Sequence, residues 1–291
     1  MNKYQTIIEN FTRWGESSAR LHAAIILGSQ AREERPADGY SDLDVSMIVD
    51  DPSWFLSSDE WLNSIGKLRI SFAEDTLNGL KERRVLFDGA LDVDFVLIPK
   101  SFFNQVYAGA ENEDPAIFTN PEVRAIFSRG YRILIDKIGL QSYLSKKKPE
   151  KPIAVLPSEH EYINIVNDFW YHSVWTVKKL KRGELWTAKM CLDSYMKGKL
   201  LKIIEFHTRA LHGANCDTWH NGRFIEEWAE DWIIKKLPLC FSRYNRDEIK
   251  SAILSTMDLF RITAVEAGKK LNLKYPVEAD EYATAWVKTA L

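Results

Sequence analysis

The chain has 291 residues, of which 45% are hydrophobic and 27% charged, a composition typical of globular proteins. At this length we expect two domains, each able to bury a core. The formal net charge of −2 gives no reason to expect a nucleic-acid partner, which usually requires a basic surface. Because the sequence has no long apolar segment and no signal-peptide pattern, we expect no membrane partner and a cytoplasmic location. Three widely spaced cysteines without a CxxC pair fit a reducing compartment and argue against a zinc site.

The first third of the chain combines one helical pattern with several extended ones. In chain order, the predicted elements are a helix over 4–20, strands over 23–27, 43–49 and 68–73, and a hairpin over 83–99. Asp88 and Gly89 form the expected hairpin turn, and Pro99 ends its second strand. Gly28 and Ser29 open a turn after the first strand, and the polar stretch that follows is typical of a helix and a loop.

The second part of the chain is helical. Residues 100–157 have a mixed pattern, and the lysine- and proline-rich segment 144–159 is typical of a linker. Beyond it, helices are predicted at 159–181, 187–212, 222–235, 245–270 and 278–290, with helix ends at Gly183 and Gly213. The sequence therefore predicts an α+β organisation, with strands and helices over residues 1–150 and an all-helical domain over 151–291.

Carboxylates inside two predicted strands are the first candidate functional residues. Asp42 and Asp44 are two residues apart on an extended segment, so their side chains leave the same face. Asp94 lies in a second apolar strand, with Asp92 on the same face, and joins the first two if the strands are neighbours. Anions this close repel unless a cation bridges them, and Mg²⁺ prefers such oxygen ligands. Three carboxylates on one face suit a pair of metals about 4 Å apart, which can align an in-line transfer with pyrophosphate as the leaving group.

The Gly28-Ser29 turn offers the complementary half of such a site. Glycine lets backbone N–H groups approach a phosphate, and the serine hydroxyl donates to it. Each signal alone is weak, since Gly-Ser is a common turn and Asp42 could cap one. The order of features is more specific: an apolar strand, Gly-Ser, a polar loop, a strand with DxD, then a hairpin strand with a third aspartate. This order predicts a site for a metal and a triphosphate.

That order resembles the nucleotidyltransferase superfamily, and the whole chain is similar to the aminoglycoside 6-adenylyltransferase (streptomycin adenylyltransferase) family. The matching stretches cover about residues 5–287 and are LGSQA, SDLDVSMIV, SSDEWLNSIGK, VDFVLIP, NDFWYHSVWTVKKLKRGELWTAK, TWHNGRFIEEW and LKYP. The resemblance implies a polymerase-β-like nucleotidyltransferase domain with a mixed sheet, followed by a helical domain. It also implies Mg²⁺-dependent transfer of AMP from ATP to a hydroxyl of an aminoglycoside, streptomycin first, which would inactivate the drug.

The resemblance assigns roles to individual residues. The family's Gly-Ser falls on Gly28 and Ser29, its metal-binding pair on Asp42 and Asp44, and its third carboxylate on Asp94. Asp94 would complete the metal site and is also the candidate acceptor of the hydroxyl proton, although a separate base stays an alternative.

Residues outside these motifs have two interpretations each. The sequence departs from the family at Gln30, where many members carry arginine, so Arg32 is the candidate to contact phosphate or hold the loop. In the helical domain, Lys189 is a candidate for the triphosphate or a solvated lysine. Asp168, Trp170 and Asp193 are candidates for a cationic substrate, or Asp193 simply pairs with Lys189 along one helix face.

Three questions stay open at this stage. The acceptor of the AMP group could instead be a lincosamide, another small molecule or a protein hydroxyl. A catalytically silent nucleotide-binding protein is a further alternative, although keeping three carboxylates without a metal would destabilise it. We expect a monomer or a weak homodimer.

Overall fold

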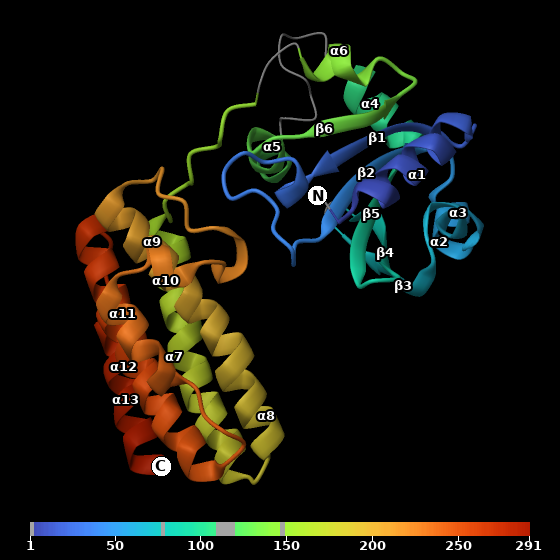
Figure 1. Ribbon diagram of the computed structural model, residues 1–291. Coiled ribbons are helices and arrows are strands. Elements are labelled where there is room, and N and C mark those ends of the chain that lie inside the picture. Colours follow the sequence, from blue (N-terminus) through green and yellow to red (C-terminus); the bar gives the residue numbers. More distant parts are fainter. Residues whose placement is uncertain (1–2, 77–78, 109–119, 146–148) are drawn as a thin grey trace. The chain divides into compact units, whose positions relative to one another are not determined.

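The computed structural model describes residues 3–76, 79–108, 120–145 and 149–291 (Figure 1). The chain divides into two compact units, Met1–Pro152 and Ile153–Leu291. The first contains a mixed sheet with helices and the second only helices, as the sequence predicted for the α+β fold class.

The first unit is built on a six-stranded sheet of order β3-β4-β5-β2-β1-β6. Its elements are α1 (Gln5–Ser17), β1 (Leu21–Leu27), β2 (Leu43–Val49), α2 (Pro52–Ser57), α3 (Glu60–Ile65), β3 (Leu68–Asp75), β4 (Lys81–Phe87), β5 (Leu91–Pro99), α4 (Lys100–Ala108), α5 (Pro121–Ser128), β6 (Arg132–Asp136) and α6 (Leu140–Leu144). Strands β2 and β5 pair in parallel, and the other neighbours are antiparallel. The hairpin β4–β5 turns at Asp88-Gly89 and ends at Pro99, which confirms the sequence prediction. Strand β6 was not predicted.

The two faces of this sheet have different surroundings because alternate residues of a strand point to opposite sides. On one face, Val45 and Phe95 pack with residues of α1, α2 and α3 in the larger core. On the other face, Ile48 packs with residues of α4, α5 and α6 in a smaller core. Asp44 lies on this second face because it is an even number of residues, four, before Ile48. Asp94 lies on it because it is next to Phe95, which points to the first face.

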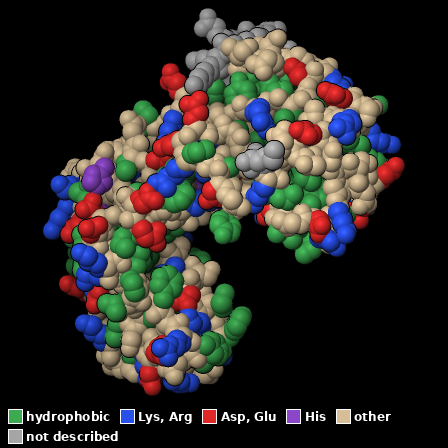
Figure 2. Space-filling view, viewed as in Figure 1, with side chains coloured by type: hydrophobic (Ala, Val, Ile, Leu, Met, Phe, Trp, Pro, Cys, Tyr) green, Lys and Arg blue, Asp and Glu red, His purple; other side chains and the backbone are tan. Residues whose placement is uncertain are grey.

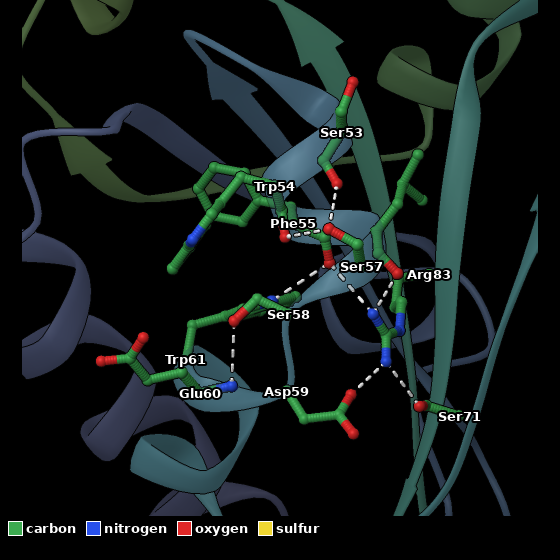
Figure 3. A network of polar contacts seen from close by, with 11 residues as sticks. Ser53, Trp54, Phe55, Ser57, Ser58, Asp59, Glu60, Trp61, Ser71 and Arg83 are labelled. Atoms are coloured by element: carbon green, nitrogen blue, oxygen red, sulfur yellow. Dashed lines mark hydrogen bonds and ion pairs between the residues drawn. The ribbon is translucent and has the colours of Figure 1, made fainter.

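A buried arginine fixes α2 and α3 to the sheet (Figure 3). The Arg83 guanidinium on β4 donates to the backbone carbonyls of Phe55 and Leu56, at the end of α2. Its Nη2 donates to Ser71 at 2.8 Å and forms an ion pair with Asp59. These contacts satisfy carbonyls that the end of a helix leaves without partners, and they offset the cost of burying the charge.

The second unit is a bundle of helices. They are α7 (Glu159–Lys181), α8 (Leu185–Met190), a π-helix (Cys191–Met196), α9 (Lys197–His212), α10 (Ile225–Trp228), α11 (Asp231–Lys236), α12 (Arg246–Leu271) and α13 (Val277–Ala290). Helix α7 begins with a capping box between Ser158 and Glu161. Gly183 and Gly213 follow helix ends, as predicted, and both have positive φ. The single predicted helix over 187–212 is instead α8, the π-helix and α9 in succession, and the predicted helix over 222–235 is two short helices.

The surface and the helices carry two further observations. On the face drawn in Figure 2, acidic and basic side chains are interspersed over both units, in keeping with the small net charge. Among the described residues, no helix is both long enough and apolar enough to cross a membrane.

Candidate active site

Three carboxylates meet where β2 and β5 begin. Asp42 precedes β2, Asp44 lies within it, and the parallel register places Asp94 of β5 directly opposite Asp44. One oxygen from each of the three side chains lies within 4.8 Å of the others. The structure therefore brings together the residues that the sequence placed on two separate strands, in a cluster of hard oxygen donors.

Asp94 is the most enclosed member of the cluster, with 7% of its surface exposed. Burial raises the pKa of Asp94 to about 7; Arg84 acts in the opposite direction, and Asp92 and Asp44 add to the rise. The Arg84 Nη2 lies 3.4 Å from Asp94 Oδ2. Asp94 Oδ1 is buried and has no hydrogen-bond partner among the described residues. A buried oxygen without a partner is costly, and a bound cation would remove that cost.

The Gly28-Ser29 turn lies against the same carboxylates. Gly28 begins a 3₁₀ turn, Gly28–Gln30, with φ +63°, and a Cβ at this position would lie 2.0 Å from Asp44 Oδ2. Only glycine fits this close approach without strain. Ser29 is 8% exposed, and its hydroxyl has no partner within the part of the chain that the structure describes. The turn and the carboxylates thus form one continuous polar site.

Two residues to which the sequence assigned no role position the carboxylates. Tyr4 is buried, and its hydroxyl donates to the Ser41 carbonyl at 2.9 Å and accepts from the Asp92 N–H at 3.2 Å. It therefore joins the beginnings of β2 and β5. Gln30, noted only as a departure from the family pattern, donates from Nε2 to the Asp42 carbonyl at 3.2 Å. No sequence signal points to Tyr4, which is 88 residues away from Asp92.

Arg32 holds the loop that follows the turn. Its Nε donates to the Arg35 carbonyl at 2.7 Å. This contact corresponds to the second of the two roles predicted for Arg32, and a contact with phosphate stays a prediction.

In the helical unit, the predicted nucleotide and substrate residues are engaged with one another or with neighbours. Lys189 forms an ion pair with Asp193 one helical turn later, which is the alternative considered for this pair. One oxygen of Asp193, Oδ1, is buried without a hydrogen-bond partner among the described residues. Both side chains are mostly enclosed, so the ion pair helps to hold the helices together, and the two residues also stay candidates for substrate binding.

Asp168 lies in a cluster of polar side chains on α7, the π-helix and α9. Lys199 Nζ lies 2.6 Å from its Oδ2, His172 Nδ1 lies 2.7 Å from its Oδ1, and the Tyr195 hydroxyl donates to both oxygens. Burial alone would raise the pKa of Asp168, but the hydrogen bonds from Lys199 and Tyr195 outweigh it, and the pKa lies below its ordinary value. A cationic substrate would have to replace Lys199.

Trp170 requires a correction. The ring is 1% exposed in the helical core, its Nε1 donates to the Tyr275 hydroxyl at 3.1 Å, and the Arg261 guanidinium lies 5.1 Å from its centroid. Arg261 in turn holds the buried carboxylate of Asp280 with two hydrogen bonds. The position that we assigned to a substrate cation is therefore enclosed and already occupied by an arginine of the chain.

The sequence profile of a family described as streptomycin adenylyltransferase matches residues 1–290. The chain belongs to this family.

Relatives of the streptomycin adenylyltransferase family align along nearly the whole chain. An aminoglycoside 6-adenylyltransferase of Bacillus subtilis (strain 168) is 23% identical over 295 residues, which cover 99% of this chain and 98% of the relative. One of Campylobacter jejuni is 22% identical over 282 residues, covering 93% of this chain and 89% of the relative. A crystal structure of an aminoglycoside 6-adenyltransferase from Bacillus subtilis has a TM-score of 0.46 and 20% identity, covering 100% of this chain and 99% of that chain.

Membership in the streptomycin adenylyltransferase family makes the protein a nucleotidyltransferase, which uses a nucleotide co-substrate. The residues of the carboxylate cluster fit a divalent cation. They offer three oxygen donors within reach of one another, and the buried Asp94 Oδ1 has no partner among the described residues. The Ser29 hydroxyl, for which the described residues offer no hydrogen-bond partner, follows Gly28 at this cluster and fits a phosphate oxygen.

Proposed function

We propose that the protein transfers AMP from ATP, with Mg²⁺, to a hydroxyl of an aminoglycoside, with streptomycin as the first candidate, and so inactivates the drug. The observation that carries this proposal is the meeting of Asp42, Asp44 and Asp94 beside the Gly28-Ser29 turn. The names of the aligned relatives support the class of acceptor.

Each residue of the carboxylate site has a role in this reaction. Asp42, Asp44 and Asp94 hold the cation, and Asp94 also accepts the proton that leaves the acceptor hydroxyl. Gly28 lets the backbone approach the triphosphate, and Ser29 donates its hydroxyl to a phosphate oxygen. When bound, Mg²⁺ supplies positive charge to the leaving pyrophosphate and lowers the pKa of the attacking hydroxyl.

The helical unit contributes the remaining proposed contacts. Lys189 binds the triphosphate and Asp193 binds the acceptor, which requires their ion pair to open. Asp168 binds a cationic group of the acceptor in place of Lys199. The guanidinium groups of streptomycin match carboxylates in charge and in shape, which favours this acceptor over a neutral one.

Mass spectrometry tests the reaction directly. The purified protein is incubated with ATP, Mg²⁺ and, in separate samples, streptomycin, a second aminoglycoside and a lincosamide. We expect streptomycin to gain one AMP group, with one pyrophosphate released. Asp44→Asn should abolish the product, whereas Asp88→Asn, which removes an exposed carboxylate in the hairpin turn of the same sheet, should not.

The outcomes separate the alternatives. An adduct on the lincosamide alone would keep the chemistry and overturn the acceptor. Binding of ATP without an adduct on any acceptor would favour a catalytically silent protein. Full turnover by Asp44→Asn would overturn the assignment of the carboxylates.

A further inference from the structure

Arg84 lies next to the carboxylate cluster, and the proposed reaction gives it no role. It is on β4, and the antiparallel register of β4 and β5 places it directly opposite Asp94. Cross-strand partners on one face of a sheet have side chains in contact range. The side chain of Arg84 is 41% exposed, whereas that of Asp94 is 10% exposed, so the contact lies at the edge of the buried site.

Two glutamates hold the guanidinium in place. Arg84 Nε donates to Glu82 Oε1 at 2.7 Å, and it lies 2.5 Å from Glu74 Oε1. Glu82 is buried, so it has few alternative positions. The Nε edge of the guanidinium is therefore fixed by β3 and β4, and its Nη2 is left 3.4 Å from Asp94 Oδ2.

The two oxygens of Asp94 differ as a result. Oδ2 is close to Arg84, and Oδ1 is buried with no hydrogen-bond partner among the described residues. A carboxylate held through one oxygen has a restricted rotation, which leaves the other oxygen in a defined direction. The positive charge of Arg84 also lowers the pKa of Asp94, against burial and the nearby Asp92 and Asp44, which raise it.

We propose that Arg84 is a positioning residue: it holds Asp94 ready for the cation, and it acts as the counter-charge of the carboxylate cluster until the cation binds. The inference rests on the proposed metal site and adds a residue to it. Glu82 and Glu74 support Arg84, so the positioning chain runs from β3 through β4 to β5.

This role predicts that Arg84 and the metal partly replace each other in stabilising the protein. Thermal unfolding of the wild type and of Arg84→Gln is measured in EDTA and in Mg²⁺ alone. Because a ligand stabilises the fold that it binds, Mg²⁺ raises the Tm of both proteins. We expect the rise to be about twice as large for Arg84→Gln, in which Asp94 lacks the charge of Arg84 in EDTA.

Matched variants separate positioning from simple packing. Arg69→Gln removes an arginine of the same sheet that pairs with the exposed Asp88, and it should leave the metal-induced rise in Tm unchanged. Arg84→Lys keeps the charge and should restore the wild-type rise, but it cannot make the fork of contacts to Glu82 and Asp94. In the transfer assay, both Arg84 variants should lose kcat by about tenfold or more, with the KM for ATP within about twofold. The reason is that Arg84 holds Asp94 and not the nucleotide.

Two results would overturn the inference. Equal metal-induced rises for the wild type and Arg84→Gln would assign Arg84 to packing alone, and a higher KM for ATP at unchanged kcat would assign it to the nucleotide. If the wild type shows neither a metal-induced rise nor transfer, the proposed function fails. The double-mutant cycle of Arg84→Gln and Asp94→Asn by urea unfolding in EDTA then decides: non-additive midpoints support the contact, and additive ones refute it.

Discussion

Gly28 offers the sharpest test of how the turn and the carboxylates depend on each other. Replacing it with alanine adds a Cβ that would lie 2.0 Å from Asp44 Oδ2 and 3.0 Å from Asp44 Cγ. Contacts under 3.0 Å hardly occur for a real Cβ, so Asp44 or the turn must move by about 1 Å or more. The φ of +63° adds strain, because L-residues avoid this region.

The two consequences of Gly28→Ala have different sizes. The positive φ costs about 1–2 kcal/mol of folding free energy, the usual value for a residue with a side chain in the left-handed region. A shift of about 1 Å in a ligand of the reacting centre lowers the rate by about 10²-fold. We therefore expect a variant that is folded and slightly less stable, with a loss of activity far larger than its loss of stability.

Gly139→Ala is the matched control. Gly139 has φ +76°, yet nothing lies within 4 Å of the added Cβ. Urea unfolding should give similar losses of stability for both variants, whereas pyrophosphate release should fall only in Gly28→Ala. If Gly28→Ala keeps its turnover to within about threefold, Asp44 tolerates the displacement and our reading of this contact is wrong.

Three more changes test separate parts of the structure. Tyr4→Phe removes the side-chain partner of two partly buried backbone groups, so urea unfolding should show a loss of about 1 kcal/mol; an unchanged midpoint would remove Tyr4 from the site. Burial raises the pKa of Asp94 to about 7 from 3.8. Between pH 3.8 and about 7, the metal-free folded state therefore binds more protons than the unfolded state, and it loses stability as the pH rises through this range. The loss, relative to Asp94→Asn, is at most about 4 kcal/mol, and parallel stability curves of the two proteins in EDTA from pH 4 to 8 would contradict it. Burial would raise the pKa of Asp280, but Arg261 and the other partners of Asp280 lower it. The charged carboxylate therefore stabilises the fold above its unfolded pKa, and this stabilisation is lost as the pH falls through the folded pKa. Asp280→Asn should cost about 3 kcal/mol at pH 7 and make the free energy of unfolding depend less on pH in acid.

The parts of the site that the sequence predicted are the local ones. The spacing of Asp42 and Asp44 on an extended segment already puts them on one face, and Gly-Ser marks a turn wherever it follows a buried strand. Asp94 was found because an aspartate within an apolar strand is costly without a compensating charge. That β2 and β5 are parallel neighbours, with Asp44 opposite Asp94, is a property of the sheet and no local pattern predicts it.

The parts that were missed depend on contacts between residues far apart in the chain. Tyr4 and Arg83 have the appearance of an ordinary helix residue and an ordinary strand residue, and their partners are many positions away. The π-helix within the predicted helix 187–212 has no signature in apolar spacing, because one extra residue in a turn hardly changes the period. Trp170 was misplaced because the same pattern of aromatic residues fits a core and a pocket equally well.

Both units contain buried aspartates, so an aspartate in the sequence does not by itself mark the active site. In the helical unit, Arg261 holds Asp280, Lys199 holds Asp168 and Lys189 pairs with Asp193, so each of these three carboxylates has its own cation from the chain. In the sheet unit, several carboxylates share one face while Arg84 contacts Asp94, whose buried Oδ1 has no hydrogen-bond partner in the part of the chain that the structure describes. A buried carboxylate oxygen without a partner is costly, and a bound cation would remove that cost. The buried Asp94 Oδ1 belongs to the cluster that Asp94 forms with Asp42 and Asp44, and for that reason we propose the catalytic site in the sheet unit.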